Sequence, residues 1–235
     1  MSPRLIGIHP IDGNLRFLKR MSRLLDRELG KAFKYQKLRN NQKSHAKCLA
    51  IVKNAGPRDT LLFLCHGRPD GILGCNYRTG PTELPGNYNH GLLISKDNAE
   101  IFKDRKVFCL TCDSNIIAKE AISRGARVFI GFDSIYFDRK QSSESYKWNK
   151  HVVNTTKHEL RKCMFSTLLH AWENDLTYFQ CAGYLKLLIN KANDRLILDY
   201  RNHRGRKFYH RSAECLQLIK EGIRVWGDGD LRISE

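Results

Sequence analysis

The chain has 235 residues, of which 41% are hydrophobic and 28% are charged, and it contains 6 prolines and 17 glycines. This composition excludes collagen-like, low-complexity and wholly disordered chains, so we expect a globular protein with a substantial core. The 41 Lys and Arg residues exceed the 24 Asp and Glu residues by 17. Such a charge attracts acidic proteins, nucleic acid or anionic membranes without choosing among them.

The first half of the chain alternates strand and helix signals, which is typical of a mostly parallel sheet covered on both faces. The predicted elements here are strand 4–11, helix 14–29, weak strand 32–38, helix 45–53, buried strand 60–65, a long loop over 67–89 with a hairpin near 91–94, buried strand 106–111, helix 115–124 and buried strand 127–132. Residues 142–193 look helical with a break near 174–175, and a hairpin of 196–200 with 207–210, a helix over 213–221 and a last strand over 223–226 follow.

These elements predict one domain over residues 1–235, an α/β protein folded as a three-layer α/β/α sandwich. Residues 1–140 would form the strand–helix core, and residues 141–235 would add helices, a basic hairpin and a closing strand. The apolar runs are far shorter than the roughly 20 residues that span a bilayer, and the first residues lack a signal-peptide pattern. We therefore expect a cytoplasmic location, no membrane span, and eight cysteines that are not in disulfides.

Two reactive side chains directly follow buried strands of this prediction. His66 follows residues 61–65, and Cys112 follows residues 107–111. Ligands of parallel sheets bind beyond the carboxyl ends of the strands, and an imidazole that takes a thiol proton creates a nucleophile. If the two strands are neighbours, His66 and Cys112 can form a catalytic dyad, with the free amides and positive end of the helix from Asn115 beside the thiol. The alternative is a loop histidine and a small buried cysteine.

Four short motifs occur in order along the chain: His66-Gly67 after one apolar strand, Thr111-Cys112-Asp113-Ser114 after another, residues 125–131, and residues 225–228. Together they resemble the caspase-like cysteine peptidase superfamily, which includes caspases, metacaspases, gingipains, separases and bacterial CHAT domains. The resemblance covers nearly the whole chain. It implies a caspase-like fold in which residues 125–131 form the next core strand and residues 227–228 the closing turn.

The resemblance also implies roles for individual residues. His66 would be the catalytic histidine and Cys112 the nucleophile, and the backbone amides of Gly67 and Cys112 would form the oxyanion hole. The implied activity is a cysteine endopeptidase that cleaves a protein partner and needs no cofactor. By similarity to bacterial CHAT-type members, a separate protein or oligomerisation would control it, in the setting of antiviral defence.

Two positions depart from the family pattern. Leu110 stands where several relatives carry Gln or Glu in the substrate pocket, and Asn115 stands where Gly is common. We expect Asp133, at the exit of the next strand, to line this pocket and favour Arg or Lys before the scissile bond. Leu110 would be its apolar wall and Asp113 a further substrate-binding residue. Asp133 as a solvated loop carboxylate or a cap for a following turn is the other interpretation.

A metal site is one alternative to the dyad. The soft ligands available to it are Cys65, His66, Cys75, Cys109 and Cys112. Side chains alternate along a strand, so Cys109 and Cys112, three residues apart, should face opposite sides of the sheet. We therefore predict no metal, and interpret Cys65 and Cys109 as core residues.

Nucleic-acid binding, or a catalytically inactive caspase-like interaction module, is the alternative from another class. Residues 201–211 carry five basic residues with two aromatic ones, a composition that suits phosphates and stacked bases. The five are Arg201, Arg204, Arg206, Lys207 and Arg211. Further positive charge on the preceding helices comes from Lys140, Lys147, Lys150, Lys157, Arg161 and Lys162.

Overall fold

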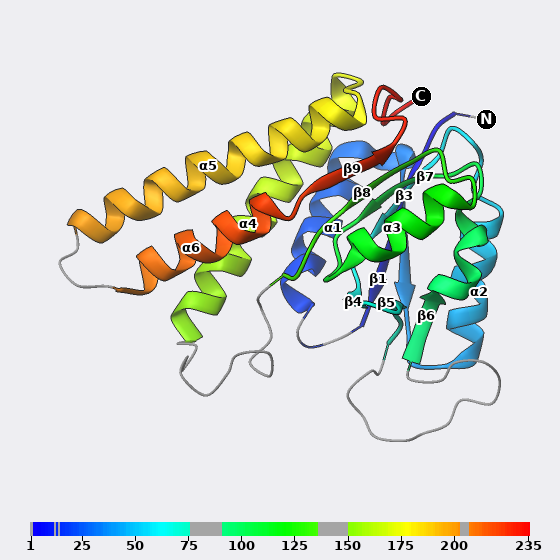
Figure 1. Ribbon diagram of the computed structural model, residues 1–235, viewed down its shortest axis with the longest axis horizontal. Helices are drawn as coiled ribbons and strands as arrows, with labels where there is room; N and C mark the ends of the chain where they lie inside the picture. The colour runs from blue at the N-terminus through cyan, green and yellow to red at the C-terminus, as the bar shows by residue number, and fades with distance from the viewer. Residues whose placement is uncertain (1, 12, 14, 76–90, 136–149, 203–206) are drawn as a thin grey trace.

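A six-stranded sheet forms the centre of the molecule. The structure is a computed structural model that describes residues 2–11, 13, 15–75, 91–135, 150–202 and 207–235. The strands lie in the order β2-β1-β3-β7-β8-β9 (Figure 1). Their bounds are Leu5–Pro10 for β1, Phe33–Leu38 for β2, Thr60–Phe63 for β3, Lys106–Cys109 for β7, Val128–Gly131 for β8 and Arg224–Gly227 for β9. All neighbouring pairs are parallel except β8 with β9, so the prediction of an α/β protein with a mostly parallel sheet is confirmed.

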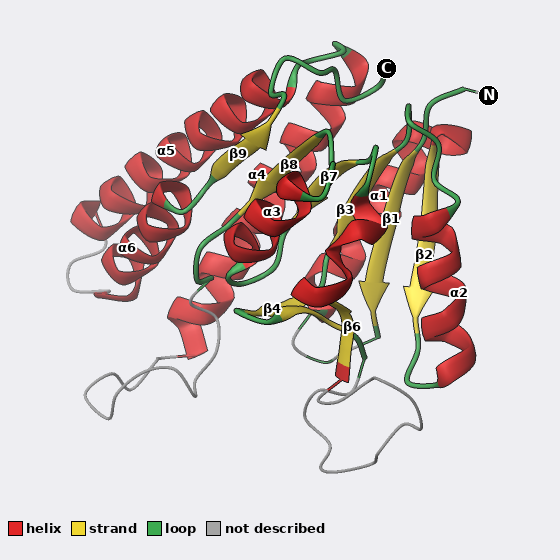
Figure 2. Ribbon diagram, turned by 45° about the vertical axis from the view of Figure 1, so that its right-hand side comes forward, coloured by secondary structure: helices red, strands yellow, loops and turns green. Residues whose placement is uncertain are grey.

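Helices cover both faces of the sheet (Figure 2). Their bounds are Arg16–Leu29 for α1, Gln42–Lys53 for α2, Ser114–Ser123 for α3, Lys150–Glu173 for α4, Tyr178–Asn202 for α5 and Lys207–Glu221 for α6, with 3-10 helices η1 at Gly30–Ala32 and η3 at Lys96–Phe102. Successive side chains of a strand point to opposite faces of the sheet, so each strand contributes to both layers of the core. In β7, Val107 packs with α2, α3 and η3, whereas Phe108 packs with α1, α4, α5 and α6. No helix in the described ranges is long and apolar enough to cross a membrane.

A second, three-stranded antiparallel sheet lies where the sequence predicts a long loop. It consists of β4 (His66–Arg68), β5 (Gly71–Leu73) and β6 (Leu92–Ser95), in that order. The loop prediction is wrong for residues 67–73, and β6 pairs with β5 instead of forming a hairpin of its own. The rest of that predicted loop, residues 76–90, lies outside the described residues. His66 therefore begins a short strand that the second sheet holds in place.

The predicted hairpin of residues 196–200 and 207–210 is also wrong. Helix α5 continues through Asn202, and α6 already begins at Lys207. Leu185, Ile189 and Leu196 are buried at helical spacing, so one apolar face of α5 extends into the first predicted strand of this hairpin. The basic residues 201–211 thus join two helices, and residues 203–206 lie outside the described part. The predicted break near residues 174–175 is confirmed between α4 and α5.

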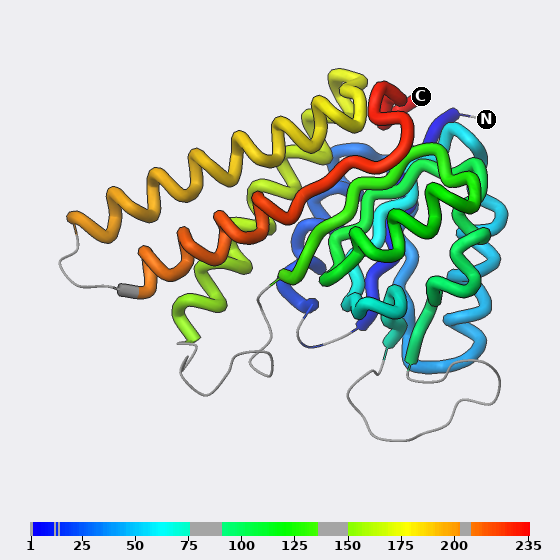
Figure 3. Tube along the Cα trace, in the orientation of Figure 1, coloured from blue at the N-terminus to red at the C-terminus, as the bar shows by residue number. Residues whose placement is uncertain are grey.

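A buried lysine ties the end of the chain to the sheet. Lys106, the first residue of β7, is fully buried, and its Nζ donates to the carbonyl oxygens of Arg232 at 2.8 Å and Glu235. Thr60, at the start of β3, donates to the carbonyl oxygen of Ile233 at 2.8 Å. The last residues therefore lie against the amino ends of two central strands, beside the N-terminal segment (Figure 3).

The buried Lys106 predicts a specific dependence of stability on pH. Burial lowers its pKa from 10.5 to about 8, so between these values the unfolded chain binds more protons than the folded chain. The free energy of unfolding should therefore rise as the pH increases across this window, by up to about 3 kcal/mol from this group. Urea unfolding of the wild type and of Lys106→Met at both ends of the window measures the difference. Equal pH dependence of the two proteins would contradict the prediction.

Candidate active site

The site forms where the chain leaves two adjacent parallel strands. Strands β3 and β7 pair in register, with Phe63 opposite Cys109, and the amide of Leu110 donates to the carbonyl oxygen of Phe63 at 2.9 Å. Both strands consequently end at the same edge of the sheet. The next residues are His66 at the start of β4 and Cys112 in the turn before α3. The expectation that these two strands are neighbours in the sheet is confirmed.

The backbone of β4 packs directly on the turn that carries Cys112. A Cβ atom at Gly67 would lie 2.0 Å from the carbonyl oxygen of Cys112 and 2.7 Å from Oγ1 of Thr111. Such distances are far below van der Waals contact, so only glycine fits here. The segment His66-Gly67 and the segment Thr111-Cys112 are therefore in contact, and the two predicted catalytic residues lie at one place in the fold.

Cys112 differs from the other cysteines in its exposure. It is half-buried, whereas the other seven of the eight cysteines, all within the described ranges, are buried. Burial raises the pKa of four of these thiols to about 12 and of a fifth to about 11; in order they are Cys48, Cys109, Cys163, Cys181 and Cys215. Those thiols stay protonated and inaccessible at neutral pH. The Sγ of Cys112 donates a hydrogen bond to the carbonyl oxygen of Ile135 at 3.4 Å.

Ser114 holds the turn between β7 and α3. Its Oγ lies 2.9 Å from the carbonyl oxygens of both Cys109 and Thr111, and it accepts a hydrogen bond from the amide of Phe132 at 2.8 Å. Asp113 has a left-handed conformation with φ of 55°, which Asp tolerates better than most residues. These features make a sharp, well-bonded turn that places Cys112 at the surface of the sheet edge.

Asn115 joins four parts of the chain, a role that sequence reasoning did not identify. Its Nδ2 donates to Oδ1 of Asp133 at 2.6 Å and to the carbonyl oxygen of Gly222 at 2.8 Å, and its Oδ1 accepts from Nε1 of Trp226 at 3.0 Å. A Cβ at Gly131 would lie 2.6 Å from the same Oδ1. The motifs at residues 111–114, 125–131 and 225–228 therefore converge on one amide side chain. Only the departure from Gly at this position had drawn attention to Asn115.

The prediction of free helix amides beside the thiol is wrong for the first turn of α3. The amide of Asn115 donates to the carbonyl oxygen of Phe132 at 3.1 Å, and that of Ile116 donates to the carbonyl oxygen of Asp113 at 3.1 Å. The amide of Asp113 donates to the carbonyl oxygen of Asp133. What α3 offers the thiol is thus the positive end of its dipole.

The three expected substrate-binding residues have structural partners. The carboxylate of Asp133 accepts from Asn115, and that of Asp113 accepts from Oγ of Ser134 at 2.8 Å. Leu110 is 3% exposed and packs in the core with α1 and α4. These contacts give no support to a pocket for basic residues built on Asp133. Asp133 is exposed, which fits the other interpretation of a solvated loop carboxylate, and its bond to Asn115 adds a structural contact.

Cys109 and Cys112 belong to clusters on opposite sides of the sheet, although β7 ends at Cys109 and strand alternation does not extend to Cys112. Cys109 belongs to the cluster with α2 and α3, and Cys112 packs at the margin of the cluster with α1 and α4. Cys65 is buried in the same cluster as Cys109, which confirms the interpretation of both as core residues. The described residues contain no group of three His, Cys, Asp or Glu side chains placed to hold a metal ion.

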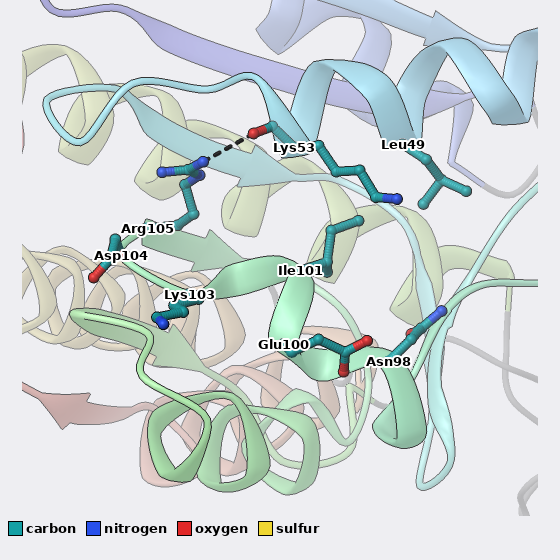
Figure 4. A pocket seen from close by; sticks show the side chains of 8 residues that line it. All are labelled: Leu49, Lys53, Asn98, Glu100, Ile101, Lys103, Asp104 and Arg105. Atoms are coloured by element: carbon teal, nitrogen blue, oxygen red, sulfur yellow. Dashed lines mark hydrogen bonds between the residues drawn. The ribbon is translucent and has the colours of Figure 1, made fainter.

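A cavity of about 450 Å³ lies between α2, η3 and the segment before β7 (Figure 4). Lys53, Glu100 and Arg105 are among its lining residues, and Arg105 donates to the carbonyl oxygen of Lys53 at 2.8 Å. Arg105 directly precedes β7, whereas Cys112 follows the other end of that strand. This cavity is therefore not the substrate site of the dyad.

Comparison of the chain with models of protein families, with curated proteins and with solved structures gives no match.

The exposure of the thiols predicts one fast-reacting cysteine. Iodoacetamide should label the native protein first at Cys112, because the other seven thiols are buried and six of them have raised pKa values. Peptide mass spectrometry after brief exposure identifies the modified residue, and Cys112→Ser should abolish fast labelling. First labelling of any other cysteine would contradict the prediction.

Proposed function

We propose that this protein is a cysteine endopeptidase of the caspase-like superfamily that cleaves a protein substrate with Cys112 and His66. The observation that carries the proposal is the packing of Gly67 on Cys112, which brings the histidine and the one half-exposed thiol to the same sheet edge. The mostly parallel sheet, with antiparallel β9 beside β8, is compatible with a caspase-like three-layer fold. The resemblance of the four motifs supplies the choice of reaction.

In the proposed reaction, Sγ of Cys112 attacks the carbonyl carbon of the scissile peptide bond as its proton passes to His66. The backbone amides of Gly67 and Cys112 stabilise the oxyanion of the tetrahedral intermediate. The intermediate collapses to a thioester on Cys112, and His66 gives its proton to the leaving amine. Water then hydrolyses the thioester, which releases the acid product and restores the thiol. No step uses a cofactor.

Control by a separate protein or by oligomerisation is part of the proposal, as is a cytoplasmic location. The control follows from the resemblance to bacterial CHAT-type proteases, and the location from the short apolar runs and the lack of a signal-peptide pattern in the first residues. The hydrogen bond from the Cys112 thiol to the carbonyl oxygen of Ile135 is compatible with such control, because this partner favours the protonated thiol over the thiolate.

The proposal predicts that Cys112→Ala and His66→Ala each reduce peptide-bond cleavage by about 10³-fold or more, because each removes one half of the dyad. Cleavage is measured by mass spectrometry on a mixed library of unfolded proteins and on candidate protein partners. Both residues lie at strand ends, so thermal unfolding should change little. Cys163→Ala and His158→Ala, on α4, are the matched controls and should retain activity. Cleavage retained by either dyad variant would refute the assignment.

The contact at Gly67 makes a separate prediction. Gly67→Ala places a methyl group within 2.0 Å of the Cys112 carbonyl oxygen, so β4 must move away from the turn. We expect cleavage to be lost and the melting temperature to fall. Gly183→Ala, on α5 with no atom within 4 Å of the added Cβ, is the control that should preserve both. Full activity of Gly67→Ala would show that the close contact is not needed.

A further inference from the structure

The positive charge of the protein is concentrated in one continuous segment. Residues 15–58 contain 13 Lys or Arg residues and only 2 acidic residues, a net charge of +11. The other 191 residues carry 28 basic and 22 acidic residues and contribute only +6 of the total of +17. Most of the field of the molecule therefore originates from less than a fifth of the chain.

This segment covers one lateral edge of the sheet. It comprises α1, β2 and α2, and β2 is the outermost strand at that edge (Figures 1 and 2). All thirteen basic side chains are exposed. They are Arg16, Lys19, Arg20, Arg23, Arg27, Lys31, Lys34, Lys37, Arg39, Lys43, Lys47, Lys53 and Arg58. We call these residues the β2-edge surface.

The charges of the β2-edge surface are almost uncompensated. Arg27 pairs with Glu28, and within the described ranges none of the other twelve lies in an ion pair. On α1, positions 16, 20, 23 and 27 follow each other at intervals of three or four, which places them along one side of the helix. Like charges arranged in this way repel one another unless an anion lies against them.

Helix α4 extends the same positive surface beside α1. Nζ of Lys157 lies 5.3 Å from the ring centroid of Phe17, on α1. The pKa of Arg161 is lowered, first by burial and next by the charge of Arg20. The side chains of Arg161 and Arg20 are therefore close to each other. A second helix thus adds positive charge where α1 already carries it.

From this surface we infer that the protein binds the phosphate backbone of nucleic acid along the β2 edge, without reading base sequence. Duplex nucleic acid carries one charge per about 1.7 Å of its axis, so it offers many anions to a surface as long as α1, whose 14 residues span about 21 Å. The basic residues lie on α1 at one face of the sheet, on α2 at the other and on β2 between them. A long polyanion can contact all three elements, whereas a short acidic peptide along the edge cannot.

A membrane is disfavoured as the partner because the surface has no apolar anchor. The large hydrophobic side chains exposed in the described ranges are Ile11, Ile116, Phe179, Leu187, Ile197, Leu198, Tyr200 and Leu218. None of them falls within residues 15–58. A helix that binds a bilayer surface inserts apolar side chains between lipids, and α1 exposes basic ones instead.

The inferred surface is not the basic segment that the sequence first suggested. The described parts of residues 201–211 are the last residues of α5 and the first turn of α6, which lie at the end of the molecule opposite α2 (Figure 1). In the described part of that region, Glu214 lies within ion-pair distance of both His210 and Arg211. The carboxylate of Glu214 therefore offsets charge at this part of α6, whereas on α1 only Arg27 has such a partner, Glu28.

The inference is tested with a fluorescein-labelled 30-base-pair DNA duplex and fluorescence anisotropy at several NaCl concentrations. The edge variant carries Arg20→Gln, Arg23→Gln and Lys37→Gln, and the control variant carries Lys119→Gln, Lys191→Gln and Arg201→Gln. Both lose three exposed charges, so circular dichroism should show both folded. We expect the edge variant to bind at least tenfold more weakly at 50 mM salt, and its slope of log K against log salt to fall by about 2.7. The control variant should stay within twofold of the wild type.

Other results overturn the inference. Equal weakening in both variants would show attraction by net charge alone. Poly-glutamate that competes as well as unlabelled duplex would assign the surface to an acidic protein, and tighter binding to phosphatidylserine vesicles than to duplex would assign it to a membrane. Absence of duplex binding at 50 mM salt would also exclude the inferred binding of nucleic acid.

Discussion

The close approach of Gly67 to the carbonyl oxygen of Cys112 is the constraint on which the candidate site depends. Strands β3 and β7 only bring their carboxyl ends to one edge, and the residues that follow them could still diverge. The absence of a side chain at Gly67 lets β4 lie on the turn after β7, with a separation that no other residue permits. The second sheet then holds β4 there, because Gly67 pairs with Ile72 of β5.

The other side of the turn is held by buried polar groups. Ser114 and Asn115 are almost fully buried, and together they bond to carbonyl or amide groups from β7, the exit of β8, the end of α6 and β9. A satisfied buried hydrogen bond stabilises a fold by only about 1 kcal/mol, but an unsatisfied partner costs more. The turn that carries Cys112 is consequently fixed by several elements at once. Rigid placement of this kind is what a nucleophile requires.

The sequence predicted the strands best where burial leaves a simple pattern. Strands β3, β7 and β8 are buried on both faces, so they read as continuous apolar runs, and their shared edge followed from parallel topology. Strands β4 and β5 have three residues each, too few for any periodicity, and only their pairing defines them. Near the end of α5, the short run Leu196-Ile197-Leu198 followed by Asp199-Tyr200 reads as a short apolar strand, although it belongs to a helix.

The candidate site was predictable only in part, for a related reason. His66 and Cys112 could be chosen because each directly follows an apolar run. The partners of Asn115 could not, because Gly222 and Trp226 lie 107 and 111 residues further along the chain. A carboxylate at a strand exit faces several directions with equal ease. The direction that the Asp133 carboxylate takes depends on its donor, Nδ2 of Asn115, which tertiary packing brings beside it.

The two edges of this sheet rely on different physics, and this separates the two proposals. The proposed chemistry at Cys112 depends on contacts of a few ångströms, so we expect one methyl group added at Gly67 to disturb it. Phosphate binding at the β2-edge surface depends on the density of charge, and salt screens each charge beyond about 10 Å. Individual exposed Lys and Arg residues there contribute little to stability, and several must be removed before the surface changes character.

Sequence reasoning weighed the basic residues by their local clustering at 201–211, whereas the fold gathers more of them from α1, β2 and α2 onto one edge. The electrostatic field is summed over space, so the density of charge in a run of eleven residues is a poorer guide to where the field is strongest than the net charge of a longer segment that folds onto one edge.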